Sequence, residues 1–316
     1  LSTPARRAAT NAARAMASLA RANASNQGAI ARAGGVPPLV DLLQSTTPHL
    51  KRRGTALSAA TESNADSIAL INEVVSAIWA TAHENPSNQA KIADQGAIPL
   101  LIALLLQRDS PEVYRNAAGA LWSLGAAETN QECIAKEHGI VPLIALLNDR
   151  GTPAGALETS AGALRSLAAL NENRVAIASS GGIPALAQLF ENGTLESKEE
   201  AAGALAALVI GNRENQSAVA HTLVSMLAST NLKAPELAKE HITRLLHTLS
   251  EDAENRGPLS KAGAILQLAE QLNNGTSVAQ ANAASALSQI ALKSPEHRVQ
   301  VTQQLVTLLG SEVDAV

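Results

Sequence analysis

Residues 88–105, NQAKIADQGAIPLLIALL, carry the pattern that decides the fold, because closely related segments recur along the chain. Each copy starts with Asn, continues through a Gly and a Pro, and ends in a leucine-rich stripe. The other well-matched copies are NQGAIARAGGVPPLVDLL at 26–43, NQECIAKEHGIVPLIALL at 130–147 and NRVAIASSGGIPALAQLF at 173–190. Self-similarity at a fixed spacing is the signature of a repeat protein.

A fifth copy, at 255–272, keeps the glycine but has Leu266 in place of the proline, and two weaker copies begin at Asn215 and His297. The starts at residues 26, 88, 130, 173, 215, 255 and 297 are separated by 62, 42, 43, 42, 40 and 42 residues. A period near 42 with one long exception predicts that repeats fill the whole chain, 1–316, as a single domain.

Each unit is predicted to contain three helices. The starting Asn can cap a short first helix, because its side-chain oxygen can accept a backbone N–H of the first turn. The glycines expected to end the first helices through a left-handed or tight turn are Gly35, Gly96, Gly139 and Gly182. The prolines expected to open the second helices are Pro37, Pro99, Pro142 and Pro184. Third helices are expected within 111–127, 157–170, 198–210 and 279–292.

Composition favours an all-α fold and excludes several functions. Apolar residues make up 46% of the chain but aromatic residues only 1%, so burial depends on Ala, Leu, Ile and Val, of which Ala and Leu favour helices. The single cysteine, Cys133, excludes an internal disulfide and indicates a reducing compartment. A net charge of −4 gives no sign of nucleic-acid binding. No apolar run approaches the roughly 20 residues of a membrane span.

In its Gly-Ile-Pro junction and its Ala-Leu third helices, the chain resembles the armadillo repeat family. The resemblance implies an all-α, right-handed superhelical solenoid of about seven to eight three-helix repeats. HEAT repeats are the alternative, but they usually lack the Gly-Ile-Pro junction. Because one repeat cannot bury its apolar faces alone, the units are expected to stack into a continuous core.

The long interval between residues 26 and 88 predicts one irregular repeat. Residues 48–63 are interpreted as the third helix of the first full unit, and a new unit is expected to begin at Asn64. A further third helix is expected from Asn72, so the 64–87 unit lacks its second helix. Either that repeat is truly short or a segment is missing from the sequence.

The resemblance implies that the third helices line a concave groove that binds a partner protein or an extended peptide. In the importin-alpha and beta-catenin branch, a Trp and an Asn four residues later often contact the ligand. Here the Trp position holds Arg14, Thr55, Ser76, Gly119, Gly162, Gly203, Arg244 and Ser285. The Asn position holds Ser18, Ala59, Ala80, Ser123, Ser166, Ala207, Thr248 and Gln289. A receptor for basic localisation signals is therefore not expected, and the small residues leave room for a bulky partner element.

Trp79, Trp122 and Arg165 lie three residues after the Trp position in successive repeats. Exposed Trp and Arg often anchor a partner, but these side chains could equally pack over the seam between repeats. Charge gives a second hypothesis, a gradient from the basic residues 51–53 to the acidic residues 199–200, with ordinary solvated surface as its alternative. The candidate groove residues are Arg14, Ser18, Lys51, Arg52, Trp79, Arg115, Asn116, Trp122, Ser123, Arg165, Ser166 and Gln289.

The sequence contains no phosphate-binding loop, nucleophile elbow or HExxH motif, so no enzymatic activity, catalytic residue, cofactor or metal is predicted. We expect a cytoplasmic or nuclear scaffold that binds another protein or a peptide. Because the chain begins at Leu1, we expect it to be part of a longer protein. Two alternatives stay open: the substrate-recognition module of a larger ubiquitin ligase, and a structural scaffold at a membrane or in a cytoskeletal assembly. Oligomeric state and partner identity are not predicted.

Overall fold

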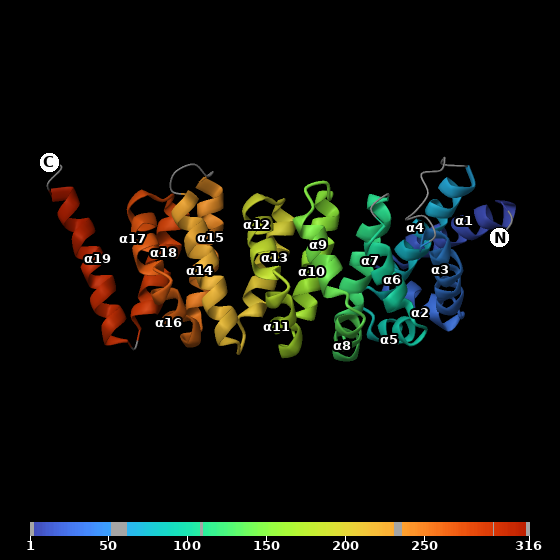
Figure 1. The fold of residues 1–316 in the computed structure, drawn as a ribbon, viewed down its shortest axis with the longest axis horizontal. Coiled ribbons are helices and arrows are strands. Elements are labelled where there is room, and N and C mark those ends of the chain that lie inside the picture. The colour runs from blue at the N-terminus through green and yellow to red at the C-terminus, as the bar shows by residue number, and fades with distance from the viewer. Residues whose placement is uncertain (1–2, 52–61, 108–109, 231–235, 293, 314–316) are drawn as a thin grey trace. The chain divides into compact units, whose positions relative to one another are not determined.

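The computed structural model describes residues 3–51, 62–107, 110–230, 236–292 and 294–313. These residues form nineteen α-helices, α1 to α19, and no strand (Figure 1). Contacts divide the chain into two compact units, the first over Leu1–Ala185 and Gly193–Ala204, the second over Leu186–Asn192 and Leu205–Val316. The single domain over 1–316 stays a prediction, and each unit is described by itself.

The first unit contains eleven complete helices and parts of two others. The complete helices are α1 (Thr3–Ala20), α2 (Ala24–Arg32), α3 (Val36–Lys51), α4 (Glu62–Ala82), α5 (Pro86–Asp94), α6 (Ala97–Leu105), α7 (Pro111–Leu124), α8 (Glu128–Lys136), α9 (Ile140–Asn148), α10 (Ala154–Leu167) and α11 (Asn171–Ser179). The unit boundary passes through α12 (Gly182–Asn192) and α13 (Leu195–Leu208). Within a repeat the three helices contact one another, as α5, α6 and α7 do (Figure 1).

The second unit contains the remaining helices: α14 (Arg213–Thr230), α15 (Glu236–Glu251), α16 (Ala253–Lys261), α17 (Ala264–Asn274), α18 (Ser277–Ala291) and α19 (Pro295–Val313). The expected three-helix unit is present as α16, α17 and α18. In the copies that begin at Asn215 and His297, the first two helices merge into α14 and α19. These two copies lack the Gly-Pro junction, so nothing in them breaks the helix.

The junction between first and second helices has two different causes. Gly96 adopts a left-handed conformation, φ 77°, which ends α5 as expected. Gly139 has φ −70° and is needed for space, because a Cβ atom there would lie 2.7 Å from Cγ2 of Ile134. In that repeat His138 takes the left-handed conformation, with φ 59°.

The starting Asn of each repeat does not cap its own helix, which corrects the prediction. The caps lie three residues earlier: Asn23 and Asn85 accept the backbone N–H of Asn26 and Asn88. Instead, Nδ2 of Asn88 donates to the Thr81 carbonyl at 3.0 Å, at the end of the preceding third helix. The neighbouring amide of Gln89 donates to the Ala82 carbonyl, also at 3.0 Å. The same Asn-Gln arrangement occurs at 26–27, 130–131 and 215–216.

These amide contacts explain why Asn and Gln recur at this place. The last carbonyls of a helix have no partner within it, and a buried carbonyl without a hydrogen bond is costly. Asn88 and Gln89 are both buried and satisfy two such carbonyls of α4. The pair therefore fastens each third helix to the first helix of the next repeat.

The irregular repeat differs from the prediction. Residues 64–71 and 72–84 were expected to form separate first and third helices, but Glu62–Ala82 is one continuous helix, α4. It contacts α3 and follows α2 and α3, so it is the third helix of the first full repeat. A separate third helix was expected at 48–63. Of these residues, 48–51 belong to α3, 62–63 belong to α4, and 52–61 lie outside the described residues. The long interval thus reflects a longer second helix, α3, and a longer third helix, α4, together with the residues 52–61 between them.

Candidate functional site

In the first unit, successive third helices pack directly on one another: α1 on α4, α4 on α7, and α7 on α10. Alanine residues such as Ala117, Ala120 and Ala161 are fully buried between these helices, so the backbones approach closely. Equivalent positions on successive helices therefore lie side by side. We call the surface of α1, α4, α7, α10 and residues 195–204 of α13 the third-helix face.

Trp79 lies flat against the next third helix at a glycine. A Cβ atom at Gly119 would lie 2.5 Å from Cε2 and 2.7 Å from Cδ2 of the Trp79 ring. Trp122 has the same relation to Gly162, where a Cβ atom would lie 2.5 Å from the ring. Gly119 and Gly162 occupy the positions at which the family resemblance led us to look for Trp.

Arg165 continues the series one repeat later. A Cβ atom at Gly203 would lie 2.7 Å from Nε and 2.8 Å from Cδ of Arg165. Its guanidinium group also forms an ion pair with Glu200 of α13, at 3.3 Å. Trp79, Trp122 and Arg165, with the glycines beneath them, are called the stacked series from here on.

The stacked series combines both interpretations made from the sequence. Each indole packs across the seam onto the glycine of the following repeat, which is a structural role. Both indoles are nevertheless only half-buried, and Arg165 is exposed, so each keeps accessible surface. Their role as anchors for a partner stays a prediction.

Arg115 belongs to the same surface. Its guanidinium carbon lies 6.0 Å from the centroid of the Trp79 ring, within the range of a cation–π interaction. Its Cδ would lie 3.2 Å from a Cβ atom at Gly155 on α10. The aromatic ring on one side and the glycine on the other hold the exposed Arg115 side chain in place.

Asn116 and Ser123 are the most buried of the described candidate residues. Asn116 is 7% exposed and donates from Nδ2 to Oδ1 of Asn72 at 2.9 Å. Ser123 is 8% exposed. The Asn116 bond joins α7 to α4, and Ser123 is buried, whereas Ser18 on α1 is exposed and Ser166 on α10 is half-buried.

The charges on this face change from α1 to α13. Near the start, Arg14 pairs with Glu73 of α4 at 3.2 Å. Toward α13, burial, Glu196 and Glu200 raise the pKa of Glu158 above its ordinary value, and Arg115 opposes this shift. A cluster of carboxylates therefore lies across α10 and α13. The side chain of Lys51 and the whole of Arg52 lie outside the described residues.

A pocket of about 310 Å³ opens on the third-helix face between the end of α1, α4 and α7. Trp79 forms part of its wall, and Arg21, His83, Arg115 and Asn116 also line it. Arg21 and His83 were not among the candidate residues. Both follow the last turn of a third helix, and only the packing of α1 on α4 brings them to one pocket.

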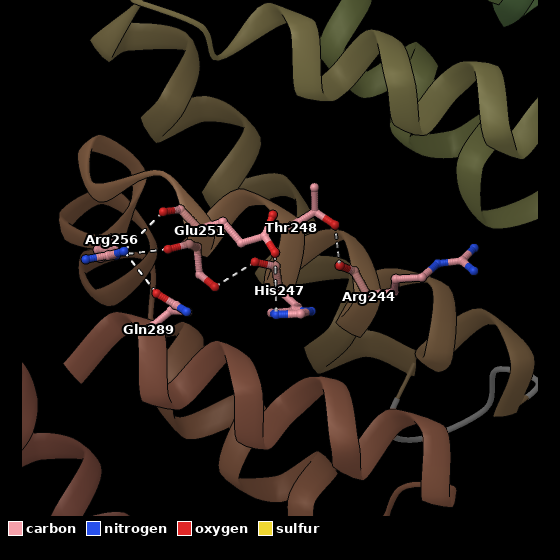
Figure 2. Close-up of polar contacts among 7 residues, drawn as sticks. Arg244, His247, Thr248, Glu251, Arg256 and Gln289 are labelled. Atoms are coloured by element: carbon pink, nitrogen blue, oxygen red, sulfur yellow. Dashed lines mark hydrogen bonds and ion pairs between the residues drawn. The ribbon is translucent and has the colours of Figure 1, made fainter. Parts of the chain in front are cut away.

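Gln289, the candidate in the second unit, has an internal partner. Its Oε1 accepts a hydrogen bond from Nη2 of Arg256 at 3.0 Å, as Figure 2 shows. The same arginine donates to the backbone carbonyls of Ser250 and Glu251 at the end of α15. Arg256 thus replaces the usual Gln of the Asn-Gln pair, and Gln289 orients it.

The described residues contain few other groups with reactive chemistry. Burial and the neighbouring Glu137 raise the pKa of the Cys133 thiol, with Lys136 opposing them, so the group is a poor nucleophile near neutral pH. Among the described residues no three His, Cys, Asp or Glu side chains gather as a metal site would require. Within the same part of the chain, no helix has the length and apolar character of a membrane span.

The stacked three-helix units place the chain among the α-helical repeat proteins. Residues 85–126 and 171–209 match the family model of the Armadillo/beta-catenin-like repeat. No curated protein sequence matches the chain. The two matched segments have the sequence pattern of armadillo repeats, so the predicted resemblance to this family is confirmed there.

Solved structures share this fold. An engineered protein from the Northeast Structural Genomics Consortium superposes with a TM-score of 0.60 at 24% identity, over 93% of this chain and 77% of that chain. A designed armadillo repeat protein in complex with the peptide (KR)4 gives a TM-score of 0.58 at 21% identity, over 92% of this chain and 95% of that chain. The all-α armadillo-repeat architecture expected from the sequence is therefore confirmed.

Proposed function

We propose that this chain is a protein-interaction module whose third-helix face in the first unit binds an extended segment of a partner protein. The observation that carries the proposal is the stacked series, in which Trp79, Trp122 and Arg165 recur once per repeat and keep accessible surface. Large flat side chains held in fixed conformations lose little entropy on binding and commonly dominate an interface.

The regular spacing suits an extended ligand. Equivalent positions on α4, α7 and α10 meet successive parts of a peptide that crosses the three helices. A designed relative is named as a complex with the peptide (KR)4, which supports peptide binding as a use of this fold. The third helices of this chain lack the Trp and Asn pairs for which the family resemblance led us to look. We therefore do not propose that the chain binds the same peptide.

The proposal includes no catalytic step, and it places the protein in the cytoplasm or nucleus. The ligase and the membrane or cytoskeletal alternatives would use the same face, with different attached functions. Nothing in the described residues favours either of them.

A selection from a library of random twelve-residue peptides on the whole chain tests this function. Selected peptides should bind the wild-type chain and lose about tenfold or more in affinity to Trp79→Ala and Trp122→Ala. The matched control is Val141→Ala, an exposed apolar residue of α9 that lies outside the third-helix face. Equal binding by all four chains, or no selected peptide at all, would refute the proposal.

A further inference from the structure

The pocket between α1, α4 and α7 has the chemistry of an anion site. Arg21, His83 and Arg115 line it together with Trp79, and no carboxylate belongs to its lining among the described residues. The net charge of the whole chain is −4, so the meeting of Arg21 and Arg115 in one pocket does not follow from composition. It results from the way three helices meet.

The backbone adds little negative charge to this pocket, although two helices end beside it. The last carbonyls of a helix carry partial negative charge when they have no partner. Here Nε2 of Gln27 lies within hydrogen-bond distance of the carbonyls of Ala20, Ala80 and His83, at 3.2, 3.0 and 3.0 Å, and these three carbonyls share its two N–H donors. The cationic side chains therefore dominate the electrostatics of the pocket.

The conformation of the Arg115 side chain is restricted before any ligand binds. Its guanidinium group lies over the Trp79 ring, and its stem contacts α10 at Gly155, so little side-chain freedom remains to be lost on binding. No ion pair to Arg115 or Arg21 forms within the described part of the chain. A planar guanidinium group binds a carboxylate through two parallel hydrogen bonds.

We propose that this pocket binds the carboxylate side chain of a Glu or Asp in an acidic partner segment, with Arg115 and Arg21 as its cationic contacts and Trp79 packing on the adjoining methylene groups. This inference rests on the proposed function and names the chemistry of the partner at one position. A pocket of about 310 Å³ accommodates one or two side chains and not a folded domain.

The neighbouring charges set the limits of the acidic segment. Glu158, Glu196 and Glu200 cluster on α10 and α13, beyond Arg115 along the same face. A partner residue over this cluster is disfavoured if it is acidic. The acidic residue therefore belongs over α4 and α7, and the part of the segment over α10 is neutral or basic.

Three fluorescein-labelled peptides of alternating Glu-Ala, Gln-Ala and Lys-Ala, each about five residues long so that it can lie over α4 and α7 without reaching α10, test the inference by anisotropy on the whole chain. The Glu-Ala peptide should bind about tenfold more tightly than the Gln-Ala peptide, and the Lys-Ala peptide should bind most weakly. Arg115→Gln and Arg21→Gln should each weaken binding of the Glu-Ala peptide by about fivefold or more. Arg150→Gln removes the same charge at an exposed residue outside the pocket and should change nothing.

Glu158→Gln provides an opposite test, because removing a carboxylate near Arg115 should tighten binding of the Glu-Ala peptide. Equal affinity for the Glu-Ala and Gln-Ala peptides, equal losses for Arg115→Gln and Arg150→Gln, or no binding of the Glu-Ala peptide would each overturn the acidic-pocket inference. The proposed function is judged separately, by whether peptides from the random library depend on Trp79 and Trp122.

Discussion

Gly119→Ala tests the stacked series directly. In a helix interior this change normally stabilises a protein by about 1 kcal/mol, because Gly has the higher entropy cost of folding. At Gly119 the new Cβ atom would lie 2.5 to 2.7 Å from three atoms of the Trp79 ring. Carbon atoms in contact are normally separated by about 3.5 Å or more, so the indole must shift by about 1 Å.

The expected magnitude follows from these two opposing effects. Overpacking of this kind costs about 1–3 kcal/mol, which exceeds or cancels the gain in helix propensity. Gly119→Ala should therefore destabilise the wild-type chain by about 0–2 kcal/mol. In a Trp79→Ala chain the clash is absent, and the same change should stabilise by up to about 1 kcal/mol. The coupling between the two sites is then about 1–3 kcal/mol.

Urea unfolding of the four chains in this double-mutant cycle measures the coupling. Trp122 remains in every chain and lies in the same unit, so its fluorescence reports unfolding there. Gly28→Ala on α2 is the control, because its nearest neighbour is the flexible end of Arg32, at 3.1 Å. A coupling below about 0.5 kcal/mol would show that the indole and the glycine are not packed as described.

Three further predictions concern single residues. Gln27→Met removes the donor shared by three helix-end carbonyls and should destabilise the chain by about 2–4 kcal/mol in urea unfolding, whereas the exposed Gln95→Met should change stability by less than about 0.5 kcal/mol. The pKa of Glu158 is raised in the folded chain, so ionisation of this carboxyl opposes folding. Glu158→Gln should therefore raise the thermal midpoint slightly near neutral pH. Below the ordinary pKa of Glu, where the carboxyl is protonated in both states, the variant and the wild type should unfold at the same temperature. An equal rise in the thermal midpoint at both pH values would contradict the electrostatic cause. Cys133 should react with iodoacetamide more slowly in the native chain than in urea at the same pH, and equal rates would contradict the raised pKa of its thiol.

The parts of the fold that depend on local sequence could be predicted. Each Gly-Pro junction interrupts the chain between first and second helices, and the regular period locates the repeats without knowledge of any contact. The merged helices α14 and α19 fall where this junction is missing. Local rules suffice here because helix ends are decided by backbone conformation within a few residues.

The features that the sequence did not reveal all depend on contacts between repeats. The recurring Asn of each unit resembles a helix cap, yet its amide reaches the end of the preceding helix seven residues away, as Asn88 does with Thr81. The irregular repeat was misplaced for a related reason. Asn64 and Asn72 look like helix starts, but both lie inside α4. A polar residue has the same local pattern whether it begins a helix or binds across a seam.

The candidate site also has one part that the sequence predicts and another that depends on packing between repeats. Alignment of third helices identified Trp79, Trp122 and Arg165 as equivalent, and the structure places all three against a glycine of the next repeat. Arg21 and His83 could not be found this way, since they become neighbours only when α1 packs on α4. Position within a repeat follows from the period, but a pocket formed by two repeats requires the geometry of their stacking.

Trp79 joins the structural and the binding roles, so its variants must separate them. The ring packs on Gly119, lies under the Arg115 guanidinium group and lines the pocket. Trp79→Ala removes all three contacts and would lower both stability and affinity, whatever the pocket binds. Trp79→Phe keeps a flat ring over the glycine and an aromatic face for the arginine, although both contacts become smaller. If the indole acts mainly by positioning Arg115, Trp79→Phe should retain most of the preference for the Glu-Ala over the Gln-Ala peptide, even where the affinity for both falls. Loss of that preference in a chain that unfolds at nearly the wild-type urea concentration would instead show that the indole itself contacts the partner.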